Sequence, residues 1–353
     1  MKPVLLPPLD VPLTLELASN ENPLGPSRRA SKAIQDALLR INRYPERDCF
    51  ATEERLARLH KLTPSHVVLG PGSFGVLRLL VEACMPAGSE AIHAEPSYPM
   101  YRALIHKVGG RPIAVPLTAD HRHDLTAMGQ AIGPATRLVI ICNPNNPTGR
   151  PVSREELDAF MDQVPPHVMV VIDEAYYEYA EGPGLPNGID WIRKGHNLVV
   201  LRTFSKVHGL AGLRIGYGIA QPQVAAMLRQ LRDPFAVSSL AQVAAQAALD
   251  DRTHVAAVRV LNEQVRSELC AALDREGLHY IPSVTNFVMI QCGGDDVSLV
   301  ERLAEQGVRV RPGTEYGMRG WLRVTVGTSE QTQRFLSTLL SCLDWSLVRA
   351  SCP

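Results

Sequence analysis

Short apolar runs recur through the first two thirds of the chain, and most are followed by a loop and a stretch with helical spacing. The runs lie at residues 66–69, 90–94, 111–115, 138–142, 168–172, 198–201 and 215–220. Short buried strands that alternate with helices build a mostly parallel sheet covered on both faces, which is an α/β fold. Ligands of such sheets bind beyond the carboxyl ends of the strands. The loops after these runs are therefore where we expect a functional site.

The pattern changes near residue 250. Residues 1–30, rich in proline and asparagine, predict an N-terminal arm with no regular element, and residues 31–250 form the large domain. Residues 251–353 predict a smaller α+β domain. Its expected helices are residues 253–277, 297–306 and 330–347, and its expected strands are residues 285–292, 307–311 and 321–326.

Charge and composition exclude several classes of protein. The 353 residues carry 36 basic and 36 acidic side chains, and a neutral chain without a basic run is a poor nucleic-acid binder. No apolar stretch approaches a membrane span, and the start MKPVLLPPLD has no signal-peptide core. The seven cysteines include no C-x-x-C pair, which is typical of free thiols in a reducing cytoplasm. No metal-binding set is expected.

Two loops contain groups that bind anions or polar rings. Gly70–Gly75 reads G-x-G-x-x-G and precedes a helix, so its backbone N–H groups can bind a phosphate. By itself the motif fits a plain turn, a phosphate site or a dinucleotide site. Residues 143–149, NPNNPTG, follow the run at 138–142, and their prolines stiffen a loop that can present the Asn146 amide. An ordinary turn is the alternative there.

Two further loops carry an acid and an amine. Asp173 and Tyr176 follow the run at 168–172, where a carboxylate at the end of a buried strand needs a partner unless the loop is a surface turn. Lys206 follows the run at 198–201, between Ser205 and a segment rich in glycine and leucine. Partial desolvation in such a setting lowers the pKa of a lysine and makes it nucleophilic.

Together these groups fit one cofactor, pyridoxal phosphate. Its aldehyde needs a lysine, its pyridine nitrogen needs an acid, and its phenolic oxygen needs donors such as Asn and Tyr. Its phosphate needs N–H groups, hydroxyls and an arginine, and Arg214 lies eight residues after Lys206.

The motifs NRYPE, CNPNNPTG, IDEAY, RTFSK and GLAGLRIGY extend this interpretation to a family. The chain resembles the fold-type-I pyridoxal-phosphate aminotransferases, and more narrowly the histidinol-phosphate aminotransferase family, over residues 17–330. The resemblance implies that an amino donor and 2-oxoglutarate react in turn on a cytoplasmic homodimer.

The resemblance also implies roles for particular residues. Lys206 would bind the cofactor covalently and move the proton, with Asp173 at the ring nitrogen and Tyr176 at the ring oxygen. The other implied cofactor contacts are Asn146 at the ring oxygen, Tyr98 on the ring face, Ser73, Phe74, Thr203, Ser205 and Arg214 at the phosphate, and Tyr44 at the phosphate of a neighbouring subunit. The implied substrate contacts are Asn22, within a lid formed by residues 20–23, Arg311 and Arg323.

The chain departs from the family pattern on the substrate side. It lacks the Tyr-x-Pro-Gly of the family's N-terminal arm, and Phe74, His208 and Ala236 stand where other residues are usual. Phe74 and the segment around Ala236 look like those of aromatic amino acid aminotransferases. The alternatives are therefore an aromatic aminotransferase, a decarboxylase resembling threonine-phosphate decarboxylase, a dinucleotide-dependent dehydrogenase and a non-enzymatic regulator. A dehydrogenase would leave Lys206 unexplained. A regulator would need an added DNA-binding domain, for which the chain has neither the length nor the basic charge.

Overall fold

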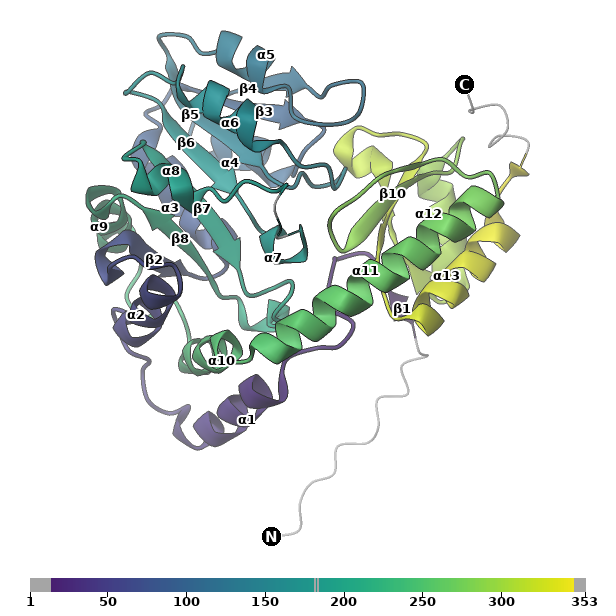
Figure 1. The fold of residues 1–353 in the computed structure, drawn as a ribbon, viewed down its shortest axis with the longest axis horizontal. Helices are drawn as coiled ribbons and strands as arrows, with labels where there is room; N and C mark the ends of the chain where they lie inside the picture. The colour runs from purple at the N-terminus through teal and green to yellow at the C-terminus, as the bar shows by residue number, and fades with distance from the viewer. Residues whose placement is uncertain (1–13, 181, 183, 346–353) are drawn as a thin grey trace.

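A computed structural model describes residues 14–180, 182 and 184–345 of the chain. A seven-stranded sheet in the order β2-β8-β7-β6-β5-β3-β4 forms the centre of the large domain (Figure 1). Strands β4, β3, β5, β6 and β7 run parallel, and β8 is antiparallel to both β7 and β2. Its strands are β2 (Val67–Gly70), β3 (Glu90–Glu95), β4 (Arg111–Pro116), β5 (Thr136–Cys142), β6 (Met169–Asp173), β7 (Leu198–Thr203) and β8 (Gly216–Ala220). The predicted α/β fold with a mostly parallel sheet is confirmed.

Helices cover both faces of this sheet, which is why its strands are apolar almost throughout. One face packs against Leu56, Met128, Phe160, Trp191 and Ala244 of α2, α5, α6, α8 and α10, and the other packs against α3, α4 and α9. The helices of the large domain are α1 (Arg28–Ala37), α2 (Phe50–Leu59), α3 (Ser73–Cys84), α4 (Met100–Lys107), α5 (Leu125–Gln130), α6 (Arg154–Met161), α7 (Tyr177–Ala180), α8 (Ile189–Arg193), α9 (Pro222–Leu231) and α10 (Ser239–Leu249). Short 3-10 turns follow α1 and precede β2 and β8.

The C-terminal part forms a second core around a four-stranded antiparallel sheet, in the order β12-β13-β10-β9. Its elements are α11 (Arg252–Arg275), β9 (Tyr280–Ile281), β10 (Phe287–Gln291), α12 (Asp296–Glu305), β11 (Val308–Arg309), β12 (Arg311–Pro312), β13 (Trp321–Thr325) and α13 (Ser329–Cys342). Helix α11 runs from the base of the large domain to the small one (Figure 1). Among the described residues, no helix has the length and apolar character to cross a membrane.

The N-terminal arm differs from its prediction. Strand β1 (Leu15–Glu16) pairs in parallel with β11, and Leu15 and Leu17 are buried in the core of the small domain. The expectation of an arm without a regular element is wrong for this part, because alternating leucines give the segment an apolar face that the distant C-terminal core buries. Helix α1 also begins inside the predicted arm, with Ser27 as its N-cap. Residues 1–13 of the arm lie outside the described residues.

The C-terminal domain also differs from its prediction in detail. The predicted strand at residues 307–311 is split into β11 and β12, which belong to different sheets. The closing helix ends at Cys342, earlier than expected. Residues 346 and 347 of the predicted helix lie outside the described part of the chain.

Candidate active site

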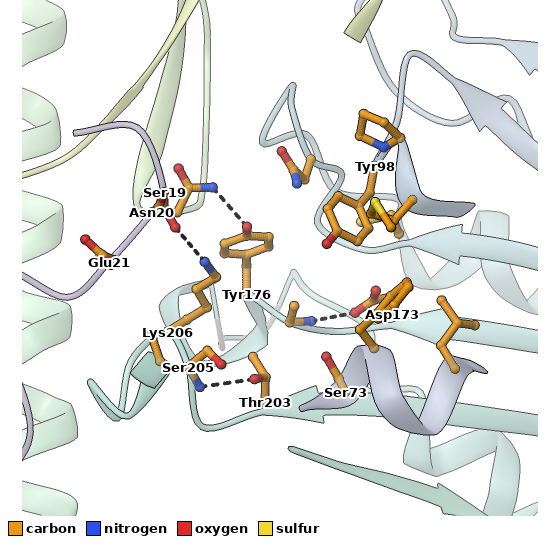
Figure 2. Close-up of a pocket in the computed structure, with 18 of the residues that line it drawn as sticks. Ser19, Asn20, Glu21, Ser73, Tyr98, Asp173, Tyr176, Thr203, Ser205 and Lys206 are labelled. Atoms are coloured by element: carbon orange, nitrogen blue, oxygen red, sulfur yellow. Dashed lines mark hydrogen bonds between the residues drawn. The ribbon is translucent and has the colours of Figure 1, made fainter. Parts of the chain in front are cut away.

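A cavity of about 620 Å³ lies at the carboxyl edge of the large sheet, where β5, β6 and β7 end and the small domain faces them. It brings together most of the predicted site residues. Those that line it are Ser73, Phe74, Tyr98, Asn146, Asp173, Tyr176, Thr203, Ser205, Lys206, Arg214, Arg311 and Arg323. Figure 2 shows Lys206, Tyr176 and Asp173 around this space; Asp173 ends β6, Tyr176 follows it, and Lys206 follows β7.

Lys206 lies three residues beyond the end of β7. Its Nζ donates to the carbonyl oxygen of Ser19 at 2.8 Å and stands 5.7 Å from the centre of the Tyr176 ring. Burial, and next the positive charge of Arg323, lower the pKa of Lys206 from its ordinary 10.5 to about 7. A large fraction of the amine is therefore neutral at neutral pH, which a nucleophile requires.

Asp173 is the last residue of β6 and is buried. Its Oδ2 accepts a hydrogen bond from the hydroxyl of Tyr101 at 2.8 Å, and its Oδ1 accepts one from the backbone N–H of Ala175 at 3.2 Å. Burial raises the pKa of this carboxyl. Within the described part of the chain no basic side chain pairs with it, although a buried carboxylate favours a cationic partner. The protonated pyridine nitrogen of bound pyridoxal phosphate would be such a partner.

Anion-binding groups gather at the start of α3. Arg214, with a φ of 53°, turns its Nη1 to within 3.3 Å of the Ser205 hydroxyl. The backbone there is closely packed, because a Cβ on Gly216 would stand 2.2 Å from the backbone nitrogen of Ser73. A helix N-terminus with an arginine and hydroxyls beside it forms a site for a phosphate.

The small domain contributes two arginines. Arg323, from β13, is buried. Its Nη1 donates to Asn146 Oδ1 at 2.7 Å, and its Nη2 donates to the Ala18 carbonyl oxygen at 2.6 Å. Its buried Nε has no hydrogen-bond partner among the described residues. Arg311, from β12, donates from Nε to the same carbonyl at 3.2 Å and from Nη1 to Glu315 at 2.7 Å. The orphaned Nε and the two guanidinium groups favour an anionic substrate.

The arm closes the cavity from the side of the small domain. Asn20 donates from Nδ2 to the Tyr176 hydroxyl at 2.9 Å (Figure 2). Its backbone N–H donates to Thr325 Oγ1 at 2.9 Å. Asn286 Nδ2 donates to the carbonyl oxygen of Asn20 at 3.0 Å. Residues 18–20 are thereby hydrogen-bonded to both domains.

Two predicted residues lie outside the cavity. The Asn22 amide donates to the carbonyl oxygens of Val207 at 2.9 Å and Gly25 at 3.3 Å. Asn20 and Glu21 line the cavity and Asn22 does not, so the substrate contact at Asn22 stays a prediction that this structure does not support. Tyr44 is 82% exposed and stacks on Phe235, with the ring centres 4.7 Å apart.

Three residues that line the cavity escaped the sequence prediction. Tyr101 follows Tyr98 by three residues at the start of α4, so helical spacing could have placed both on one side. Glu315 lies four residues after Arg311, a spacing that permits an ion pair. The Ser19 carbonyl carried no sequence signal, because its role depends on the contact between the arm and Lys206.

The donor set fits pyridoxal phosphate. This cofactor requires an amine, an acid and a phosphate site in one cavity. The cavity contains the Lys206 amine with its lowered pKa, the buried Asp173 carboxyl, which has no cationic partner among the described residues, and the anion-binding groups at the start of α3. Lys206 would hold the aldehyde carbon, Asp173 the ring nitrogen, and Ser73, Ser205 and Arg214 the phosphate.

Comparisons with known proteins agree with this geometry. The model of the family "Aminotransferase class I and II" matches residues 14–339. The histidinol-phosphate aminotransferase of Moorella thermoacetica is 43% identical over 336 residues, which cover 95% of this chain and 87% of that protein. Histidinol-phosphate aminotransferase 2 of Pseudomonas fluorescens Pf-5 is 44% identical over 95% of this chain and 90% of its own length.

Solved structures show the same fold. The crystal structure of histidinol-phosphate aminotransferase from Sinorhizobium meliloti, in complex with pyridoxal 5'-phosphate, superposes with a TM-score of 0.87 at 28% identity, over 96% of this chain and 92% of that one. The putative histidinol-phosphate aminotransferase of Erwinia carotovora also gives 0.87, at 27% identity over 93% and 95% of the two chains.

The chain is thus a pyridoxal-phosphate-dependent enzyme that belongs to the class I and II aminotransferases, and within them to the family of the histidinol-phosphate aminotransferases. The predictions of family, enzyme class and cofactor are confirmed. The dehydrogenase and regulator alternatives are wrong, because the aminotransferase family matches nearly the whole chain and its relatives are aminotransferases.

Proposed function

We propose that this enzyme transfers the amino group between histidinol phosphate and 2-oxoglutarate, as a step in histidine biosynthesis. The observation that supports this proposal most strongly is that Arg311 and Arg323 line the same cavity as Lys206. The buried Nε of Arg323 has no hydrogen-bond partner among the described residues. Each of the two substrates ends in an anion, a phosphate on one and a carboxylate on the other, and the paired guanidinium groups can bind either. The names of the curated relatives support this choice of substrate.

In this proposal the large domain performs the chemistry. Pyridoxal phosphate, when bound, withdraws electrons from the substrate carbon that loses its proton. Lys206 Nζ, which faces the cavity, would take that proton from the substrate carbon and return it as a general acid. Asp173 holds the ring nitrogen in its protonated form, while Tyr176 and Asn146 orient the ring oxygen. Arg214 and Ser205 hold the phosphate in place throughout.

The small domain and the arm select the substrate in this scheme. Arg323 binds the carboxylate or phosphate of whichever substrate is present, and Arg311 lies beside it. The Ala18 carbonyl, which now accepts from both arginines, gives way to the incoming anion. Because both substrates use the same groups, they bind in turn and the kinetics are ping-pong.

An aromatic amino acid aminotransferase is the second candidate, because Phe74 lines the cavity and can pack against an apolar ring. A decarboxylase with the same cofactor contacts would release carbon dioxide instead of an oxo acid.

A half-reaction screen tests the proposal. The holoenzyme is mixed in turn with histidinol phosphate, phenylalanine, tyrosine, aspartate and glutamate, and the change in cofactor absorbance is followed. Histidinol phosphate and glutamate are expected to react fastest. A faster reaction with phenylalanine or tyrosine would move the assignment to aromatic substrates, and carbon dioxide as product would move it to a decarboxylase.

The proposal includes a cytoplasmic homodimer. Leu39 and Ile41 are 90% and 62% exposed, and they precede the exposed Tyr44 by a few residues in the chain. A second copy can cover exposed apolar side chains of this kind. Tyr44 would then reach the cofactor phosphate of the partner. Sedimentation of the holoenzyme as a dimer, and its shift toward monomer in Leu39→Asp, test this; a monomeric native enzyme would refute it. The cysteines of the described chain are free thiols, as a reducing cytoplasm favours.

A further inference from the structure

A second cavity of about 580 Å³ lies behind the catalytic one. His208 lines it two residues after Lys206, and Tyr177 lines it directly after Tyr176. The two cavities therefore share the chain segments that carry the catalytic side chains but contain different residues. The other walls come from the end of α2, from α8, from β7 and β8, and from the first turns of α11.

Basic side chains outnumber acidic ones in the lining of this second cavity. They are Lys61, Arg193, Arg202, Arg252 and Arg259, against the single carboxylate of Glu178. Two of them are neutralised: Arg202 by Glu174, with N···O distances of 2.9 and 2.8 Å, and Arg193 by Asp190 at 2.9 Å.

Two of the basic groups have no counter-charge. Among the described residues, the ammonium group of Lys61 and the guanidinium group of Arg252 make no hydrogen bond or ion pair. Both residues are exposed, so they mark the mouth of the cavity, where they can reach an anion from solvent.

The interior of the second cavity is lined by rings. Tyr177 lies under the Arg202 guanidinium, with 3.7 Å from Cζ to the ring centre, and His60 Nε2 is 3.2 Å from the Tyr217 hydroxyl. His208 Nδ1 is buried and has no hydrogen-bond partner within the described chain. Burial lowers the pKa of His60 to about 3 and that of His208 to about 4, so both imidazoles are neutral at pH 7. Neutral rings with one free nitrogen can stack on a planar group and hydrogen-bond to it.

We propose that this second cavity is a binding site for a small aromatic anion, a planar ring that carries a phosphate or carboxylate. The ring enters between the tyrosines and histidines, and the anionic group stays at the mouth with Lys61 and Arg252. The site is separate from the catalytic cavity. It spans the large domain and the first turns of α11, so a ligand in it contacts the helix that leads to the small domain (Figure 1).

Calorimetric titration of the holoenzyme with phenyl phosphate tests the proposal. Phenyl phosphate is expected to bind in the millimolar range or tighter, while inorganic phosphate, which lacks the ring, and phenol, which lacks the charge, bind at least about tenfold more weakly. Absence of heat with phenyl phosphate would overturn the proposal. Equal binding of inorganic phosphate would overturn the role of the rings.

Variants locate the bound anion. Arg252→Gln and Lys61→Gln are each expected to weaken phenyl phosphate about fivefold, because each removes one partly exposed charge. Arg275→Gln, at the other end of α11, is the matched control and is expected to leave the affinity unchanged. Arg311→Gln removes a cation of the catalytic cavity. If Arg311→Gln abolishes binding while Arg252→Gln does not, the anion sits in the catalytic cavity and the proposal fails.

Discussion

The two walls of the catalytic cavity are built in different ways. On the large-domain side, Asp173 and Thr203 end strands that are hydrogen-bonded on both sides, so the sheet itself sets their positions. On the other side, Arg323 and Arg311 come from a small antiparallel sheet, and their guanidinium groups meet at the carbonyl of Ala18. The wall assigned to the chemistry is thus held by one sheet, whereas the wall assigned to substrate selection depends on three distant segments.

The strongest test of this comparison removes the amine. Lys206→Ala is expected to lower turnover by about 10³-fold or more, because Lys206 is the one lysine among the described residues that line the cavity. The visible absorbance of covalently bound cofactor should disappear with it. Steady-state kinetics and an absorbance spectrum measure both effects, with the exposed Lys107→Ala as control. Native turnover in Lys206→Ala would show that the large-domain wall has been misassigned.

The lowered pKa of Lys206 predicts a pH dependence in the cofactor-free protein. At pH 7 the neutral fraction of an amine with a pKa of about 7 exceeds that of an ordinary lysine about a thousandfold. The rate of reaction with added pyridoxal phosphate should therefore rise with pH and level off above about 7. Continued increase toward pH 10 would mean that the amine is not desolvated.

The same shift affects stability, with a defined sign. The pKa of Lys206 is lower in the folded than in the unfolded chain, so the unfolded chain binds more protons between about pH 7 and 10.5. The free energy of unfolding gains from this group as pH rises through that window. In denaturant titrations, the free energy of unfolding of the native protein should rise more steeply with pH than that of Lys206→Met inside this window, and the two slopes should agree outside it.

Asp173→Asn tests the acid on the same wall. The amide keeps the shape and can still accept from Tyr101, but it cannot pair with a cationic nitrogen, so turnover is expected to fall about 10²-fold. The fold should persist, which circular dichroism checks. Asp190→Asn, a partly exposed carboxylate on α8 that does not line the catalytic cavity, is the control. Full activity in Asp173→Asn would remove this carboxylate from the proposed mechanism.

Substitutions of the two arginines on the small-domain wall are expected to change KM more than kcat. Arg323→Gln should raise the KM of the anionic substrates about tenfold or more, since a buried charged donor is lost. Arg311→Gln should raise it less, because the Arg311 side chain is 37% exposed and is already paired with Glu315. Steady-state kinetics with both substrates separate the two arginines. A loss confined to kcat would contradict the division of labour between the walls.

The smallest expected effect concerns Glu315. This carboxylate competes with a substrate anion for Arg311, so Glu315→Gln is expected to lower the KM of an anionic substrate about threefold, as an exposed ion pair allows. Glu305→Gln, at the end of α12, serves as control. An unchanged or higher KM in Glu315→Gln would mean that the pair orients Arg311 and does not compete for it.

The two walls were also not equally predictable. The residues of the large-domain wall follow apolar runs directly, so the rule that parallel strands end at one edge was sufficient to place Asp173, Asn146 and Lys206 together. The arm was predicted poorly. Leu15 and Leu17 find their core nearly three hundred residues away, and Asn22 turns to Val207, not to the cavity. Contacts of this kind depend on which segments meet after folding, and local pattern does not specify that.

The sequence by itself determined the α/β architecture, the family and the chemical groups of the site, because buried strands, tight turns and reactive side chains are local properties of the chain. Only the tertiary structure decided that Tyr101 faces Asp173 and that the Ala18 and Ser19 carbonyls meet the arginines and Lys206. It also decided that Lys61 and Arg252, which have no ion-pair partner among the described residues, line a second cavity. Each of these depends on a distance between groups far apart in sequence. Hydrogen bonds and ion pairs form only between groups that are close in space. The partners of these groups are therefore set only when the two domains and the arm come together.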